Sequence, residues 1–262
     1  MMKALSIQNA TVRLEGKTIL REITWEVNVG ERYFLLGANG AGKTTLVKVI
    51  TGFLWPLYGA KVELLGKKFG EVNLLELRKQ IAWVSPMMHQ WMTNPQWTGK
   101  EIVISGIDST IGLYRKVTET ELAQATELLR LLRAEHLLNQ PLRTMSSGEQ
   151  VKVLIARALM TEPQMMILDE PSVYLDVTGR EFLLRTIEEL ARKRPELTIL
   201  FITQRIEDIL PIFERGMILK QGEIMAAGWR EEILTEENLK KAFEMELRLT
   251  RTRSGRLWTV IE

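Results

Sequence analysis

A nine-residue segment between a short apolar run and a helix-forming stretch constrains this chain most. Residues 37–45 read Gly-Ala-Asn-Gly-Ala-Gly-Lys-Thr-Thr and fit the pattern G-x-x-x-x-G-K-[ST]. Glycines at these spacings let successive backbone N–H groups converge on one anion, and the N-terminus of the following helix adds partial positive charge. A merely flexible glycine loop would not need the apolar strand before it and the helix after it. We therefore expect a phosphate-binding turn between a buried strand and a helix.

Each residue of this loop has an expected role when a nucleotide is bound. Lys43 would reach the β- and γ-phosphates as a mobile cation. Thr44 would place its hydroxyl on Mg²⁺, and Thr45 could donate to a phosphate oxygen nearer the sugar. The other loop residues would contact the phosphates through the backbone, and they are Gly37, Ala38, Asn39, Gly40, Ala41 and Gly42.

Two adjacent carboxylates follow another apolar run. Residues 165–168 are Met-Met-Ile-Leu, and Asp169 and Glu170 come directly after them. A carboxylate at the end of a buried strand can hold Mg²⁺, and a second one can orient an attacking water. We therefore assign Asp169 to the metal and Glu170 to the general base. The alternative is that the two acids only end the strand and cap the segment after it.

Composition excludes several other classes of function. The 262 residues suit one domain with a subdivision. The 35 lysine and arginine residues nearly balance 33 acidic ones, so net charge does not recruit nucleic acid or acidic lipid. There is no cysteine, which excludes disulfides and thiolate metal sites. The sequence has no apolar signal core and no run of eighteen apolar residues, so we expect a cytosolic chain that does not span a membrane.

Hydrophobic periodicity predicts strands and helices in alternation along most of the chain. Strands are expected within 4–36 and at 61–65, 81–84, 165–168, 198–203 and 217–226, with a last pair around 253–255. Helices are expected at 43–52, 72–80, 149–160, 178–193 and 230–244. Residues 85–97 lack a period and are predicted to form a loop. Residues 99–138 are predicted to be helical throughout, most clearly 119–132 with Thr118 as N-cap, which indicates a helical insertion into an α/β chain.

A second candidate anion site opens the helix at 149–160. Ser146-Ser147-Gly148-Glu149 contains the pattern Ser-x-x-Glu, a capping box that would start any helix. The alternative is that Ser146 and the Gly148 N–H face an anion at this helix N-terminus. The residues alone leave both interpretations open.

Four segments together resemble the nucleotide-binding domain of ATP-binding cassette (ABC) proteins: 37–45, 145–150, 165–170 and 175–176. The resemblance covers nearly the whole chain. It implies an α/β P-loop NTPase fold of the ABC type, with an N-terminal antiparallel β-subdomain and an inserted helical subdomain. The expected organisation is a single domain over 1–262, with a catalytic core at 1–85 and 143–262 and a helical subdomain at about 86–142.

The resemblance also implies a function. Two such domains would sandwich two ATP molecules with Mg²⁺, each phosphate loop being closed by Ser146 and Gly148 of the opposite subunit. Asp176 would lie in the loop that links the two sites, and it could also cap the next helix. The implied protein is a subunit that dimerises on ATP, as a homodimer or a heterodimer, and hydrolyses it to drive transport. The permease would be a separate integral membrane protein, which would hold this subunit at the inner face of the cell membrane.

Two alternatives stay open beside that function. One is a soluble ABC ATPase that is not tied to transport, and the other is a nucleotide-responsive interaction module that barely hydrolyses. No direct contact with nucleic acid is expected, because acids alternate with the basic residues of the tail and favour a solvated face. These basic residues are Lys240, Lys241, Arg248, Arg251, Arg253 and Arg256.

The chain departs from the family's pattern in its signature segment, Met145–Glu149, and at Gln204. The signature usually reads Leu-Ser-Gly-Gly-Gln, and here Glu149 places a negative charge near polyphosphate. A histidine usually follows the strand at 198–203, where this chain has Gln204. Its amide can donate to the γ-phosphate but carries no charge, and losing a charge-assisted contact costs about 1.5 to 3 kcal/mol. We therefore expect slow hydrolysis with nucleotide binding preserved.

Further departures concern the base and the metal. Leu14 stands where the family stacks an aromatic ring on adenine, so base preference is open. Pro86 stands where a glutamine usually completes the Mg²⁺ shell, and either Gln90 or water would take that place. His89 is expected to be a loop residue rather than a metal ligand.

A group of methionine and tryptophan side chains has two interpretations. In transporters of this family the loop after the strand at 81–84 and the helical insertion form a groove that receives a short helix of the membrane subunit. These side chains could line that groove. They could equally pack inside the helical subdomain. The residues are Met87, Met88, Trp91, Met92 and Trp97.

Overall fold

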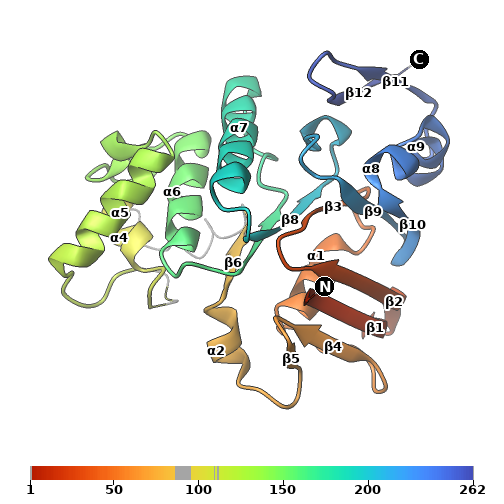
Figure 1. The fold of residues 1–262 in the computed structure, drawn as a ribbon, viewed down its shortest axis with the longest axis horizontal. Coiled ribbons are helices and arrows are strands. Elements are labelled where there is room, and N and C mark those ends of the chain that lie inside the picture. Colours follow the sequence, from red (N-terminus) through yellow and green to blue (C-terminus); the bar gives the residue numbers. More distant parts are fainter. Residues whose placement is uncertain (1, 86–95, 109, 111, 262) are drawn as a thin grey trace. The chain divides into compact units, whose positions relative to one another are not determined.

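The computed structural model describes residues 2–85, 96–108, 110 and 112–261 (Figure 1). It divides into two compact units, a first unit of Met1–Arg78 with Ala191–Glu262 and a second unit of Lys79–Leu190. The second unit is wider than the helical subdomain expected at 86–142, because it also contains β6 (Ile81–Val84), β7 (Met165–Asp169) and α6 (Ser147–Leu159). The single-domain organisation over 1–262 stays a prediction.

The first unit contains the predicted antiparallel β-subdomain and a largely parallel sheet. Strands β2-β1-β4-β5 form the antiparallel sheet, and β10-β9-β3-β8 lie next to one another in the second sheet, where β10 alone is antiparallel to its neighbour. Its strands are β1 (Lys3–Leu14), β2 (Lys17–Asn28), β3 (Arg32–Leu36), β4 (Lys61–Leu64), β5 (Lys67–Lys68), β8 (Thr198–Thr203), β9 (Arg215–Lys220), β10 (Glu223–Trp229), β11 (Leu247–Arg251) and β12 (Leu257–Ile261). Its helices are α1 (Lys43–Ile50), α2 (Leu74–Arg78), η3 (Ile206–Asp208), α8 (Arg230–Ile233) and α9 (Glu236–Phe243).

The parallel strands of the first unit are buried along nearly their whole length. Every residue of β8 is buried, as are four of the five residues of β3. Such unbroken apolar runs are typical of strands covered on both faces. The register pairs Leu36 with Thr203, so the carboxyl ends of β3 and β8 meet at one edge of the sheet. The segments after these two strands are therefore brought together.

The second unit packs helices around a short parallel strand pair. Helices α4, α5 and α6 lie against one another (Figure 1), and β6 runs parallel to β7. Its remaining elements are α4 (Gly99–Ile104), α5 (Glu119–Leu131), η1 (Glu135–Leu137), η2 (Leu142–Thr144) and most of α7 (Val177–Lys193). The predicted N-cap is confirmed, since the Thr118 side chain accepts a hydrogen bond from Glu121 N.

The prediction that 99–138 is helical throughout is wrong between α4 and α5. Gly106 lies so close to α6 that an added Cβ would stand 2.2 Å from the Arg157 carbonyl oxygen. The Arg157 guanidinium donates to the Thr110 carbonyl oxygen at 2.8 Å, and Gly112 has a φ of 92°. The half-buried arginine thus satisfies a backbone carbonyl that a helix would have paired with its own N–H groups. A smaller difference is that Lys67 and Lys68 form a short strand, β5, outside the strands expected from the sequence.

The C-terminal strand pair is fixed to η3. Arg256 Nη2 donates to the Glu207 carbonyl oxygen at 2.8 Å, and Thr259 N donates to Glu207 Oε1 at 3.2 Å. Basic residues nearby form surface ion pairs, such as Lys241 with Glu237 at 2.7 Å. This pairing agrees with the solvated face expected from the alternating charges.

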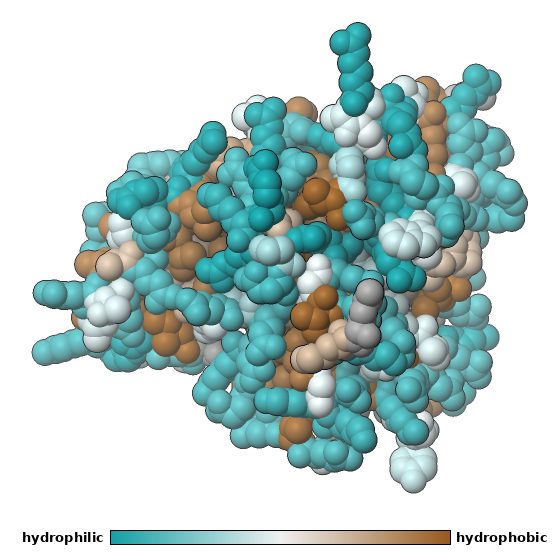
Figure 2. All heavy atoms as spheres, in the orientation of Figure 1, coloured by the Kyte–Doolittle hydropathy of each residue, from teal (hydrophilic) through white to brown (hydrophobic). Residues whose placement is uncertain are grey.

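Hydrophilic side chains cover most of the face in Figure 2, and hydrophobic residues reach it as separate patches. Among the helices that the structure describes, none combines the length and the apolar character needed to cross a bilayer.

Candidate functional site

The phosphate loop of the first unit favours glycine at three of its positions. Gly42 has a φ of 105°, and a Cβ there would lie 2.8 Å from Leu20 Cδ2. A Cβ on Gly37 would lie 2.6 Å from the Leu219 carbonyl oxygen. Gly40, with a φ of 79°, has open space around it and is exposed. The loop is therefore packed tightly against the protein at both ends and open at its middle, as a cradle for a ligand must be.

Lys43 closes this loop on itself. Its side chain is buried, and Nζ donates to the carbonyl oxygens of Gly37 at 2.8 Å and Ala38 at 3.0 Å. It begins α1, whose N-terminus has no side-chain cap and no acidic residue in its first turn. The ammonium and the first backbone N–H groups of α1 thus present positive charge with no carboxylate from the same turn to compensate it. Thr44 and Thr45 follow, both half-buried.

Gln204 lies at the same sheet edge as the phosphate loop. The Gly37 N–H donates to the Thr203 carbonyl oxygen at 3.4 Å, which joins the start of the loop to the end of β8. Thr203 Oγ1 accepts a hydrogen bond from Arg205 N at 2.9 Å, and this bond closes a tight turn at Gln204. Gln204 is half-buried. The structure therefore brings two of the predicted catalytic residues, Lys43 and Gln204, to one edge. The role of each is still a prediction.

The two acids stand at the end of β7 in the second unit. Asp169 is the last residue of β7 and is 3% exposed. Glu170 is half-buried and has a φ of 52°, a left-handed conformation that costs a non-glycine residue about 1 kcal/mol or more. Eight other non-glycine residues in the described part of the chain, among them Glu15 and Gln221, also have a positive φ. The conformation therefore does not separate the two interpretations of Glu170, and its role as general base stays a prediction.

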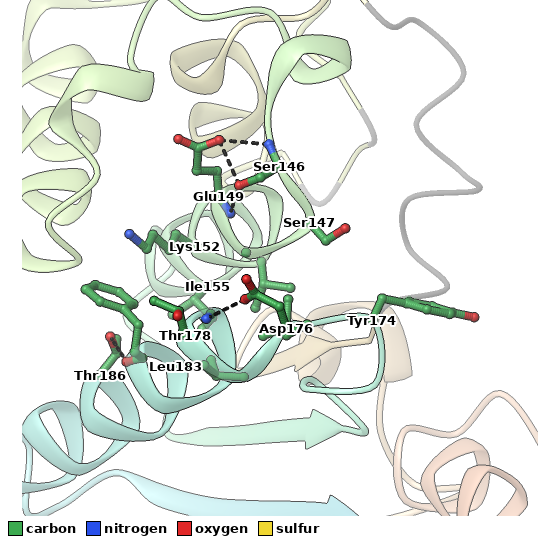
Figure 3. Close-up of a pocket in the computed structure, with 15 residues that line it drawn as sticks. Ser146, Ser147, Glu149, Lys152, Ile155, Tyr174, Asp176, Thr178, Leu183 and Thr186 are labelled. Carbon is green, nitrogen blue, oxygen red and sulfur yellow. Dashed lines mark hydrogen bonds between the residues drawn. The ribbon is translucent and has the colours of Figure 1, made fainter.

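The signature segment forms the predicted capping box. Ser146 Oγ accepts from Glu149 N at 3.4 Å, and Glu149 Oε2 accepts from Ser146 N at 2.7 Å and from Ser146 Oγ at 2.9 Å (Figure 3). The backbone hydrogen bond from Ser146 is the main cause that lowers the pKa of Glu149 below its usual value. A charged carboxylate of the chain itself thus occupies the N-terminus of α6. Contact of Ser146 and Gly148 with a nucleotide stays a prediction.

A cavity of about 440 Å³ opens between the N-terminal turns of α6 and α7. Asp176 Oδ1 accepts from Gly179 N at 2.7 Å, so the predicted cap of α7 is confirmed (Figure 3). Lys152 Nζ lies 3.6 Å from the centroid of the Phe182 ring, and burial lowers the pKa of this lysine. Tyr174 points away from the other lining side chains (Figure 3).

Sequence reasoning missed Lys152, although its spacing carried a signal. It lies one helical turn after Gly148, so a helix beginning at Ser147 places both on one side. Both residues line the cavity.

Comparison with known proteins decides the family. The family model described as ABC transporter matches residues 20–173. The chain belongs to the ABC transporter family. The ABC transporter ATP-binding protein YlmA of Bacillus subtilis, itself uncharacterised, is 39% identical over 241 residues, which span 92% of this chain and 90% of YlmA.

Solved ABC cassettes share the fold. MJ1267, an ATP-binding cassette of an ABC transporter in its ADP conformation, matches with a TM-score of 0.78 and 26% identity over 93% of this chain and 98% of that one. MJ0796, described as dimeric in a post-hydrolysis state with ADP and Pi, matches with a TM-score of 0.72 and 23% identity over 86% of this chain and 98% of that one. This chain is thus an ATP-binding ABC ATPase, and the P-loop NTPase fold predicted from its sequence is confirmed.

Several residues with an expected role lie outside the described residues. They are Pro86, where a glutamine is usual, its possible substitute Gln90, the expected loop residue His89, and Met87, Met88, Trp91 and Met92 of the expected groove. Trp97 is described and packs within the second unit, edge-on to Tyr114 at 6.2 Å between ring centroids. Leu14, at the end of β1, is 40% exposed and so is accessible to a base.

Replacing Lys43 tests the predicted contact between this lysine and the phosphates of ATP. We expect Lys43→Ala to weaken ATP binding about 10- to 150-fold, because it removes a charge-assisted contact of about 1.5 to 3 kcal/mol. Titration calorimetry with Mg·ATP measures the affinity. The thermal unfolding temperature of the variant shows whether losing the hydrogen bonds from Lys43 to the loop carbonyl oxygens affects folding. The matched control is Lys48→Ala on the exposed side of α1, which should bind normally. Equal affinities for the two variants would contradict the assignment.

Proposed function

We propose that this chain is the ATP-binding subunit of a membrane transporter, which pairs with a second ABC domain on Mg·ATP and separates after hydrolysis. The observation that carries the proposal is the loop between β3 and α1, where the glycine-rich turn leads into a helix that begins with the buried Lys43 and has no side-chain cap and no acidic residue in its first turn. Membership of the ABC transporter family supports it. The dimeric state described for the MJ0796 cassette is the precedent for the pairing.

Two residues would hold the metal. Thr44 supplies a hydroxyl oxygen and Asp169 a buried carboxylate, an all-oxygen donor set that suits Mg²⁺. When bound, Mg²⁺ supplies charge that neutralises the β- and γ-phosphates.

The remaining roles fall to side chains of this chain and of the second domain. Glu170 would accept a proton from the attacking water, and Gln204 would donate an amide hydrogen bond to the γ-phosphate. Ser146 and Gly148 of the second domain would close the site from the other side. Asp176, which caps α7, would stand in the segment that joins the two sites. The second domain would be another copy of this chain, in a homodimer, or a different ABC domain, in a heterodimer.

A separate integral membrane permease is the proposed partner, and it would place this subunit at the inner face of the cell membrane. The alternatives are a soluble ABC ATPase and a weakly hydrolysing interaction module. Gln204 and Glu149 favour the second of these. Affinity purification of the tagged chain from detergent-solubilised cells should recover an integral membrane protein in stoichiometric amount. An untagged strain is the control. Recovery of the chain alone, or with RNA, would contradict the transporter proposal and favour the alternatives.

Neutralising the general base tests the pairing. We expect Glu170→Gln to bind ATP, to lose turnover by at least about 100-fold, and to accumulate as an ATP-bound dimer, because the step that separates the domains is blocked. Size-exclusion chromatography with light scattering, with and without Mg·ATP, measures the dimer. The matched control is Glu188→Gln, which changes an exposed carboxylate on α7. This variant should hydrolyse ATP and dimerise to the same extent as the unchanged protein. A monomer at saturating ATP would overturn the proposed function.

Gln204 tests the expectation of slow hydrolysis. Gln204→His should raise turnover about tenfold or more without tightening ATP binding, because histidine can carry charge to the γ-phosphate. Gln204→Leu, which removes the donor and nearly keeps the volume, should lower it. Phosphate release at saturating Mg·ATP measures both variants. Unchanged or reduced turnover in Gln204→His would show that Gln204 does not limit the rate.

A further inference from the structure

The segment between α1 and β4 exposes large apolar side chains. Residues 53–58, here called the aromatic tip, read Phe-Leu-Trp-Pro-Leu-Tyr. Trp55 is 55% exposed, Tyr58 is fully exposed, and Phe53 and Leu57 are exposed as well. Exposed apolar side chains that gather in one place mark a contact with a partner, whereas isolated ones need no explanation. The aromatic tip is therefore a candidate contact surface of the first unit.

Hydrogen bonds of the backbone fix the aromatic tip on the first unit. The Phe53 N–H donates to the Lys48 carbonyl oxygen of α1 at 2.8 Å, and the Leu57 N–H donates to the Thr11 carbonyl oxygen of β1 at 2.8 Å. The tip is thus tied to a helix at one end and to a strand at the other. Its exposed side chains need no rearrangement to reach a partner.

A hollow of about 850 Å³ lies beside the aromatic tip. Trp55 and Tyr58 line it from the tip, and Trp55 also leans on Phe69, with 5.9 Å between the ring centroids. Lys61 of β4 and Lys68 of β5 line it from the edge of the antiparallel sheet. Both lysines are exposed, and among the ion pairs within the described residues none involves either of them. Two aromatic rings and two ammonium groups therefore share one surface.

The chain around this surface has an excess of positive charge. Residues 48–78 contain five lysine or arginine residues and three glutamates, an excess equal to the formal charge of +2 of the whole chain. Two of the glutamates, Glu63 and Glu71, line the hollow, so both signs of charge occur there. Lysines on an edge strand can serve only to prevent pairing with another chain, but that role does not need exposed aromatic rings beside them. The excess favours a partner with negative charge.

The surface of a phospholipid bilayer matches this combination of side chains. Tryptophan and tyrosine rings are favoured at the level of the lipid headgroups, and lysine is attracted to anionic lipid. Headgroup phosphates suit Lys61 and Lys68, and a headgroup amine suits Glu63 and Glu71. Since none of the described helices could cross a bilayer, lipid would be met from the surface of the fold.

We propose that the aromatic tip, together with Lys61 and Lys68, contacts the surface of an anionic phospholipid bilayer. The inference deepens the proposed function and rests on it for the location of the chain beside a membrane. Trp55 and Tyr58 insert among the headgroups, and the two lysines contact lipid phosphates. This contact adds to the one with the permease and does not replace it.

Sedimentation of the purified chain with vesicles tests the proposal. One set of vesicles contains phosphatidylcholine alone, and in the other about one third of it is replaced by phosphatidylglycerol. We expect the chain to bind the anionic vesicles about tenfold more tightly than the neutral ones, and added salt should weaken that binding. Trp55→Ser combined with Tyr58→Ser should weaken binding to the anionic vesicles about tenfold or more, because the inserting rings are lost. Lys61→Gln combined with Lys68→Gln should remove most of the preference for anionic lipid.

The matched controls change similar groups elsewhere in the first unit. Trp229→Ser replaces another tryptophan, which is 52% exposed, and Arg192→Gln combined with Lys193→Gln removes two exposed charges. Both controls should bind the anionic vesicles as the unchanged chain does. The affinity for Mg·ATP and the thermal unfolding temperature, measured for every variant, show that folded proteins are being compared.

The inference is overturned if the chain does not bind anionic vesicles, or binds them equally well without Trp55 and Tyr58. An unchanged lipid preference in the Lys61 and Lys68 variant would also overturn it. So would a Trp55 and Tyr58 variant that binds vesicles normally but recovers no integral membrane protein from detergent-solubilised cells, because the tip would then be a contact with the permease. The vesicles contain no permease, so failure of the proposed function is seen separately, when the unchanged chain recovers no membrane protein.

Discussion

The start of α1, which has no side-chain cap, is the constraint on which the phosphate site depends. Every helix begins with backbone donors that need a partner, and most helices supply one from a side chain. In α1 the N-cap is Gly42, which has no side chain to offer, and Lys43 adds a cation instead of an acid. The sequence around this turn thus lacks the usual side-chain cap, a feature that suits the binding of an anionic ligand.

The signature segment differs from the phosphate loop, because side chains of the chain itself cap the helix that follows it. Ser146 and Glu149 form a reciprocal capping box at α6, so a carboxylate lies at the N-terminus where a phosphate would bind. An incoming anion must then compete with a group of the chain itself, which lowers the gain from contact with the N-terminus of α6. The two helices therefore differ in how ready they are for polyphosphate, although both present a helix N-terminus.

Local patterns made much of this structure predictable. The phosphate loop, the buried strand before Asp169, the capping box at Ser146 and the cap at Asp176 each depend on residues within a few positions of one another. Hydrophobic periodicity also placed β8, and with it Gln204 at the end of a strand. Such features follow from backbone geometry and do not need the rest of the fold.

Some of the misses depend on contacts between distant residues, and one goes against local propensity. The segment between α4 and α5 contains Gly106 and Gly112, which disfavour a helix, and Arg157 of α6 binds its backbone at Thr110. His136 meets Glu149 across a turn and a second 3₁₀ segment, η2, so no spacing rule connects them. The left-handed conformation of Glu170 is likewise invisible in a sequence, because glutamate has no preference for it.

The last strand pair has a consequence for the edge where Gln204 lies. Arg256 and Thr259 bind Glu207, which stands three residues after Gln204 and belongs to η3. The strand pair β11–β12 thus restrains η3, which follows the turn that contains Gln204. A protein shortened before β11 would keep every motif of its family and still leave that turn with fewer restraints.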